Sequence, residues 1–309
     1  MDLNKLRGCR LPRNRRTWAI AHVGLVAVAI LAVVGYLMIE ETSSGWAASS
    51  RTAQPTTHSA PTQVVLPVDL WDPDGLAVDD LGAVYVADSG HKRVLKLPAG
   101  ATTATALPFS DSLVPAGLAI DSNGGLYVID EVSHEVLNLP AGSKTPIALP
   151  FSGLGEAHGL AVDRSDSLYV VDYENNKVLK LPAGATTPAE LPFNELDHPY
   201  DVAIDDAGTV YVTDSGNNRV AALTAGSTTP AYLPFTDLRF PAGVTVDRSG
   251  SVYVADLDDN RVLKLAAGSN TQSQLPFTGL FSPIDVAVDD AGAVYVIDYH
   301  HRLLKLQMG

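Results

Sequence analysis

The chain has 309 residues and a formal charge of −14, with 46% hydrophobic and 18% charged residues. This composition excludes a mostly disordered protein, because enough apolar residues are present to build a core. Residues 1–17 hold six basic residues and Asp2, a charge of +5, so the rest of the chain carries −19. Such an acidic body disfavours nucleic-acid binding, and the single Cys9 rules out an intrachain disulfide.

The N-terminal segment has the pattern of a membrane anchor. Residues 19–39 contain no Asp, Glu, Lys or Arg, and at about 1.5 Å per residue they can cross a hydrocarbon core of about 30 Å. Because the basic residues precede this stretch, the sequence predicts a cytoplasmic tail at 1–17 and a transmembrane helix at 18–39. A flexible linker rich in Ser, Thr, Ala and Pro follows at 40–61, which places the rest of the protein outside the cytoplasm. The alternative is a signal peptide cleaved near residues 45–47, which yields a secreted protein.

From residue 62 to 309 the sequence repeats every 42 residues, which is the interval from Tyr85 to Tyr127. One tyrosine and two aspartates recur in all six units, at Tyr85, Tyr127, Tyr169, Tyr211, Tyr253 and Tyr295, at Asp79, Asp121, Asp163, Asp205, Asp247 and Asp289, and at Asp88, Asp130, Asp172, Asp214, Asp256 and Asp298. Each unit holds four short apolar runs between turn residues, in the first unit 75–79, 83–88, 93–97 and 104–109, which we name strands a to d. No helical period occurs, so an all-β, six-bladed propeller is predicted over 62–309.

The two ends of the repeat region complement each other. The sixth unit stops after its strand c, whereas residues 62–67 form an apolar run that belongs to no unit. We therefore expect this N-terminal run to supply strand d of the sixth blade. Closure of this kind leaves no open edge in the ring, so we expect a monomeric propeller.

Residues that recur in all six blades are expected to build the scaffold. The Asp79 row ends strand a, where a carboxylate accepts hydrogen bonds from turn amides. The Asp88 row stands five residues before a basic residue in most units, which predicts turn capping and ion pairing across the b-to-c turn. In the second unit Glu135 replaces the basic residue, so Asp130 lacks this partner. Calcium binding by these carboxylates is the alternative.

Residues that differ between blades are the functional candidates. Antiparallel strands place the d-to-a and b-to-c connections on one face, here called the candidate face, and the a-to-b and c-to-d connections on the opposite face. The candidate face combines aromatic residues, carboxylates and histidines, which favours recognition by exposed side chains. The selected contact residues are Trp71, Asp74, His158, Tyr200, Asp201 and Asp285 in the d-to-a connections and Tyr173 and Tyr299 in the b-to-c turns.

The repeat resembles the NHL repeat. Its pattern stands at 199–205, 208–214 and 215–220, and the resemblance covers residues 62 to 309. The phrases at 264–271 and 275–280 look more specifically like the extracytoplasmic sensor domain of bacterial receptor-type serine/threonine kinases. Residues 1–17, which precede the predicted span, are too few for a kinase domain. The resemblance therefore implies sensing or adhesion outside the cytoplasm and does not imply phosphoryl transfer.

Three functions follow for the outer part. The first is a non-catalytic binding or sensor module for a protein, peptide or cell-envelope polymer, with no cofactor. The second is a metal-dependent lyase or hydrolase with ligands from Asp74, His158, Asp201 and Asp285, because some similar propellers, including an amidating lyase, hold a metal at the channel mouth. The third is a structural or assembly role. No phosphate-binding loop, nucleophile elbow or cysteine nucleophile is present in the repeats.

Overall fold

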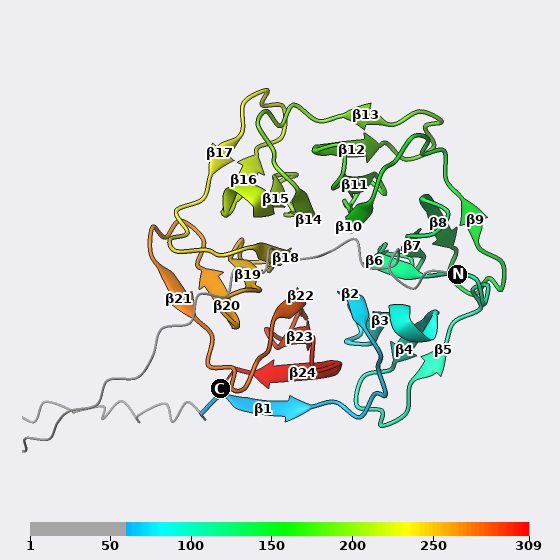
Figure 1. Ribbon diagram of the computed structural model, residues 1–309, viewed down its shortest axis with the longest axis horizontal. Helices are drawn as coiled ribbons and strands as arrows, with labels where there is room; N and C mark the ends of the chain where they lie inside the picture. The colour runs from blue at the N-terminus through cyan, green and yellow to red at the C-terminus, as the bar shows by residue number, and fades with distance from the viewer. Residues whose placement is uncertain (1–59, 309) are drawn as a thin grey trace, which may run out of the picture. The chain divides into compact units, whose positions relative to one another are not determined.

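The computed structural model describes residues 60–308, and the predicted tail, transmembrane helix and most of the linker lie outside these residues. Six antiparallel sheets of four strands each are arranged in a ring around a central axis (Figure 1). The cavity lined by Asp74, His158 and Asp285, among others, is called the channel. The all-β six-bladed propeller is therefore confirmed. Among residues 60–308, no helix has the length and apolar character needed to cross a membrane.

Each blade contributes one strand to each of four concentric positions. Strands a, nearest the channel, are β2 (Pro73–Val78), β6 (Pro115–Ile120), β10 (Ala157–Val162), β14 (Pro199–Ile204), β18 (Pro241–Val246) and β22 (Pro283–Val288). Strands b are β3 (Val84–Asp88), β7 (Leu126–Asp130), β11 (Leu168–Asp172), β15 (Val210–Asp214), β19 (Val252–Asp256) and β23 (Val294–Asp298). Strands c are β4 (Arg93–Leu97), β8 (Glu135–Leu139), β12 (Lys177–Leu181), β16 (Arg219–Leu223), β20 (Arg261–Leu265) and β24 (Arg302–Gln307). Strands d are β5 (Thr105–Ala106), β9 (Ile147–Ala148), β13 (Ala189–Glu190), β17 (Ala231–Tyr232), β21 (Gln272–Gln274) and β1 (Thr62–Val65).

The core lies between neighbouring blades. Strands b are buried along almost their whole length, because both faces of a blade pack against other blades, and their sequences are accordingly continuous runs of Val, Tyr, Ile, Leu and Ala. The cluster between blades 1 and 2 joins Tyr85 and Ala87 of the first blade to Leu118 and Leu126 of the second. Each blade therefore depends on its neighbours for burial.

The ring closes through its two chain ends, as the sequence predicts. β1 pairs antiparallel with β24, with Val65 opposite Leu304, and the Leu66 N–H donates to the Leu303 carbonyl oxygen at 2.8 Å. The sixth sheet therefore has the order β1–β24–β23–β22. Because β24 runs toward the opposite face and β1 is antiparallel to it, the chain enters the propeller at the opposite face.

Both aspartate rows serve the scaffold. Asp79 Oδ1 accepts the amides of Leu81 and Ala83 at 3.0 and 2.8 Å, which confirms the turn capping. Asp88 is fully buried and accepts the Trp71 amide and Arg93 Nε, both at 2.7 Å. Its carboxylate thus joins the d-to-a connection to the b-to-c turn, which explains why every blade keeps this aspartate.

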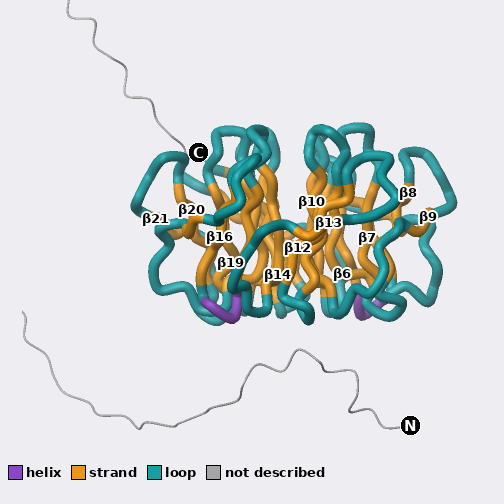
Figure 2. Tube along the Cα trace, turned by 90° about the horizontal axis from the view of Figure 1, so that it is seen from above, coloured by secondary structure: helices purple, strands orange, loops and turns teal. Residues whose placement is uncertain are grey.

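The two faces carry different connections. The short 3-10 helices η1 (Ser89–His91) and η2 (Ser215–Asn217) belong to b-to-c turns and lie on one side of the ring in Figure 2. On the opposite face, Arg248 pairs with Asp290 at 2.5 Å and with Asp80 at 3.5 Å, which links the a-to-b turns of blades 5, 6 and 1. An arginine that reaches from blade 5 to blade 1 shows that the ring is narrow at this end.

Candidate functional site

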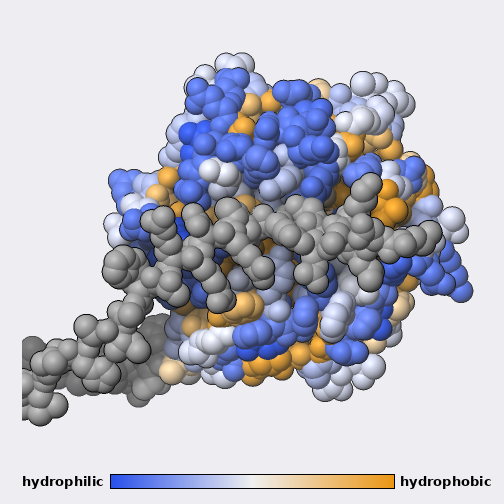
Figure 3. All heavy atoms as spheres, in the orientation of Figure 1, coloured by the Kyte–Doolittle hydropathy of each residue, from blue (hydrophilic) through white to orange (hydrophobic). Residues whose placement is uncertain are grey.

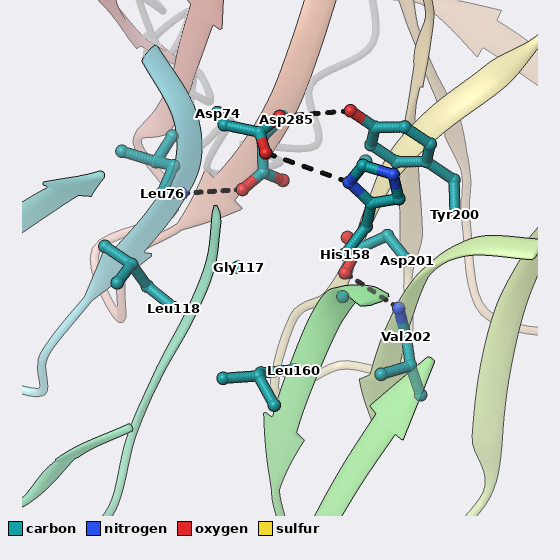
Figure 4. A pocket seen from close by; sticks show the side chains of 12 residues that line it. Asp74, Leu76, Gly117, Leu118, His158, Leu160, Tyr200, Asp201, Val202 and Asp285 are labelled. Carbon is teal, nitrogen blue, oxygen red and sulfur yellow. Dashed lines mark hydrogen bonds and ion pairs between the residues drawn. The ribbon is translucent and has the colours of Figure 1, made fainter. Parts of the chain in front are cut away.

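Three strands a bring the central candidate residues together. Asp74, His158 and Tyr200 each occupy the second position of their strand, in β2, β10 and β14. Because these positions are equivalent in the repeat, the three side chains lie at the same height at the candidate-face end of the channel. Figure 4 shows them converging from blades 1, 3 and 4. We call Asp74, Glu131, Glu156, His158, Tyr173 and Tyr200 the mouth cluster.

His158 is the centre of this cluster and is only 5% exposed. Its ring stacks on Tyr200 at a centroid distance of 4.5 Å and meets the edge of Tyr173 at 5.1 Å. Nδ1 lies 3.8 Å from Asp74 Oδ2, and Nε2 lies 3.6 Å from Glu156 Oε1. The Tyr200 hydroxyl donates to Asp74 Oδ1 at 3.1 Å, so the aromatic rings and the carboxylates fix one another.

Glu131 completes the cluster and was not among the selected residues. One ligand atom from each of Asp74, Glu131 and His158 lies within 4.8 Å of the others. Glu131 follows strand b of the second blade, and the same position holds the selected residues Tyr173 and Tyr299 in blades 3 and 6. The repeat alignment therefore contained the signal that points to this residue.

Asp74 and Glu131 have opposite pKa shifts. Burial and then the charge of Asp74 raise the pKa of Glu131 to about 8. Burial also acts to raise the pKa of Asp74, but the hydrogen bond and positive charge of His158, together with a hydrogen bond from Glu131, outweigh it and lower this pKa. Near neutral pH the two carboxyl groups therefore share one proton, held mainly by Glu131. The cluster combines a proton donor, a carboxylate and an imidazole.

Asp201 and Asp285 have a different role from the one expected of metal ligands. Asp201 accepts the amides of Val202 and Val244 at 2.8 and 2.7 Å, and Asp285 accepts those of Val286 and Leu76, both at 2.7 Å. Each carboxylate thus joins its own blade to the next one around the channel. Burial raises the pKa of Asp201 to about 7 and that of Asp285 well above its usual range.

The channel beneath the cluster is small. Its cavity has a volume of about 50 Å³ and is lined by Asp74, His158, Tyr200, Asp201 and Asp285, among others. This volume accommodates an ion or a few water molecules but no organic ligand, for which pockets of about 300–1,000 Å³ are usual. An organic ligand that contacts the mouth cluster must therefore bind at the surface of the candidate face. Where the surface is visible in Figure 3, hydrophilic residues predominate and hydrophobic patches are separated.

Trp71 and Tyr299 belong to other parts of the candidate face. Trp71 is 59% exposed and stacks on His301 at 5.2 Å, and Tyr299 is 37% exposed. The expectation of exposed aromatic residues is therefore confirmed for these two. It is wrong for Tyr200, which is only 7% exposed because its ring packs against His158 and the edge of Phe240.

The NHL repeat family matches residues 70–97, 154–181, 196–223 and 238–265, which lie in blades 1, 3, 4 and 5. The chain carries NHL repeats. Asp74, His158 and Tyr200 lie inside matched NHL repeats, whereas Glu131 lies in blade 2, which also lost the basic partner of Asp130. The departure of blade 2 from the NHL pattern therefore coincides with its contribution to the mouth cluster.

Among curated proteins, the chain is similar to serine/threonine-protein kinase PknD from two strains of Mycobacterium tuberculosis. The identity is 45% over 100 residues, which cover 31% of this chain and 14% of the kinase. The match thus spans about a seventh of the kinase's length. The resemblance of these NHL repeats to a bacterial serine/threonine kinase is confirmed over that segment.

Solved structures show the same fold. A streptogramin B lyase matches with 13% identity and a TM-score of 0.62, over 81% of this chain and 97% of the lyase. A gluconolactonase from Xanthomonas campestris matches with 16% identity and a TM-score of 0.69, over 80% and 89% of the two chains. A nidogen/laminin complex matches with 21% identity and a TM-score of 0.62, over 68% and 83%. At these identities the likeness concerns the fold alone.

Proposed function

We propose that the protein is a membrane-anchored, extracytoplasmic binding or sensor module that engages a protein, peptide or cell-envelope polymer on its candidate face. The observation that carries this proposal is the mouth cluster. Six side chains from four blades meet there, at repeat positions that hold different residues in different blades. The similarity to a segment of a bacterial kinase supports a role in sensing.

The charge of the mouth cluster favours a ligand with a positive group. Asp74, Glu131 and Glu156 surround a single histidine. A ligand ammonium or guanidinium group at this position replaces the shared proton of Asp74 and Glu131 and relieves the repulsion between them. The acidic body attracts the same kind of ligand over a longer range.

The direction of β1 shows at which face the chain enters the propeller. β1 starts opposite Gln307, the last residue of β24, so the chain enters the propeller at the opposite face. The mouth cluster therefore lies at the other end of the channel from the start of β1.

The test compares binding of the full chain, in detergent, to two immobilised peptides, one rich in lysine and one with the same lysines acetylated. We expect binding to the first only. Asp74→Asn combined with Glu131→Gln should weaken it on the order of tenfold or more. Glu190→Gln, a charge change on the exposed outer strand β13, is the matched control. Equal binding by the site variant and the control contradicts the proposal.

A second candidate function is a metal-dependent lyase or hydrolase. The observation in its favour is the group of Asp74, Glu131 and His158, whose nitrogen and oxygen donors suit a divalent transition metal. These residues would hold the ion, which polarises a substrate carbonyl when bound, while Glu156 orients the imidazole. Elemental analysis of the purified full chain distinguishes the two functions. Stoichiometric metal that is lost in His158→Ala supports the enzyme, and metal-free protein that binds the lysine peptide supports the binding module.

A further inference from the structure

The junction between blades 6 and 1, where the ring closes, differs from the other five. After strand d, blades 1 to 5 continue with Leu-Pro-Phe, and the aromatic residues are Phe109, Phe151, Phe193, Phe235 and Phe277. At the closing junction the sequence is Leu66-Pro67-Val68. The backbone is the same, since the Val68 amide donates to the Leu66 carbonyl oxygen at 2.9 Å and that of Phe151 to Leu149 at 2.8 Å. A smaller side chain therefore stands at an equivalent position.

A cavity of about 520 Å³ lies at this junction, and we call it the closure cavity. Its apolar lining includes Leu66, Val84, Leu97, Ala101 and Tyr295. The repeat places equivalent residues at the junction of blades 2 and 3, at Leu149, Leu168, Leu181, Ala185 and Tyr127, where all five pack in one cluster with Phe151. The walls of the closure cavity thus match those that elsewhere in the molecule surround a phenylalanine ring.

A second departure from the repeat adds an apolar rim. Leu81, at the tip of the a-to-b turn of blade 1, lines the cavity and is 85% exposed. The equivalent residues of the other blades are Asn123, Ser165, Ala207, Ser249 and Ala291. Exposing a leucine side chain at this tip does not stabilise the fold, and none of the other five equivalent tips has one. Leu81 also lies beside the one junction that lacks a phenylalanine.

The charged residues around the closure cavity indicate which charge a ligand of this cavity should carry. Asp80, Asp289 and Asp290 line it together with Lys305, and Arg248 pairs with Asp80 and Asp290. Three carboxylates against two basic groups leave a negative rim.

We propose that the closure cavity binds a phenylalanine side chain from a partner protein, in a segment with a basic residue beside it. The surface is distinct from the mouth cluster, because it lies between the a-to-b and c-to-d connections of the opposite face.

The probe is a fluorescent peptide, Lys-Leu-Pro-Phe-Thr-Gly-Leu, which adds a lysine to residues 275–280 of this chain, and its Phe→Ala version. Polarisation with the full chain in detergent should show saturable binding of the first peptide and on the order of tenfold weaker binding of the second, whose lysine can still reach the mouth cluster. Val68→Phe installs at this junction the phenylalanine of the other five, so it should raise Tm and abolish binding. Leu81→Asn, which installs the residue of blade 2, should weaken binding on the order of tenfold.

Val132→Phe is the matched control, because Val132 is 64% exposed on the candidate face and its replacement leaves the cavity intact. If Val68→Phe lowers Tm, Leu81→Asn alone decides the outcome. The proposal is overturned by absence of binding to the unmodified chain, by equal binding of the Phe→Ala peptide, or by wild-type affinity in Leu81→Asn. The mouth variant Asp74→Asn should keep the preference for the phenylalanine peptide over its Phe→Ala version, which separates failure of this proposal from failure of the proposed function.

Discussion

Replacement of Asp214 by alanine should destabilise the propeller by about 3 kcal/mol. This carboxylate is fully buried and accepts Arg219 Nε at 2.6 Å, the Asp197 amide at 2.7 Å and Asn217 Nδ2 at 2.9 Å. Breaking a buried ion pair costs about 3–5 kcal/mol. We take the lower end because the Arg219 side chain is 27% exposed and keeps a hydrogen bond from Nη2 to the Glu195 carbonyl oxygen.

Blade 2 provides the internal comparison. Asp130 accepts the amides of Val114 and Val132, both at 3.1 Å, and the Ser133 hydroxyl at 2.8 Å, and no basic side chain pairs with it within residues 60–308. Asp130→Ala should therefore cost only about 1–2 kcal/mol. Glu135 lies directly opposite Asp130 across the β7–β8 pair. Glu135→Arg should remove this like-charge repulsion, supply the missing cation and stabilise the protein by about 1 kcal/mol.

The assay is urea unfolding followed by circular dichroism and tryptophan fluorescence, with Tm measured in parallel. For a domain of this size, about 3 kcal/mol corresponds to a fall in Tm of about 6–12 °C. Equal losses for Asp214→Ala and Asp130→Ala would refute the reasoning, because the two sites differ chiefly in the arginine. No gain from Glu135→Arg would refute it independently.

Three further predictions concern pH, closure and the channel. The pKa of Glu131 is about 8 in the folded protein against 4.5 in the unfolded chain, and that of Asp201 is about 7 against 3.8. The folded protein therefore binds more protons than the unfolded chain between these values. Its free energy of unfolding should fall as pH rises from about 5 to about 8. Glu131→Gln should flatten this fall in urea titrations at several pH values, and an unchanged slope counts against the assignment. Deletion of residues 62–65 should expose the β24 edge and cause aggregation in size-exclusion chromatography, whereas a soluble monomer contradicts the role of β1 in closure. Gly243→Ala should lower Tm, because an added Cβ would lie 2.5 Å from Asp285 Oδ1, and an unchanged Tm shows that the blades can separate there.

The fixed period of the repeat predicted the fold in detail. A constant spacing forces every unit into the same four strands, so blade number, strand order and the pairing of β1 with β24 all follow from the alignment of units. The roles of the Asp79 and Asp88 rows were predictable for the same reason, since a carboxylate repeated at six turns has the same local amides beside it each time. Because every repeat forms the same local structure and packs on its neighbours, the repeat determines the architecture of the whole propeller.

The mouth cluster required the tertiary structure. The sequence identified Asp74, His158 and Tyr200 as variable residues on one face, but only the ring geometry shows that His158 lies between Tyr200, Tyr173 and two carboxylates. Glu131 joins them from blade 2, although His158 belongs to blade 3 and Asp74 to blade 1. Distances across a channel depend on how far blades 1, 2, 3 and 4 turn toward one another. The spacing of residues in the sequence does not determine how the blades are oriented relative to one another. The contacts between the side chains that differ from blade to blade are therefore decided by the packing of the blades.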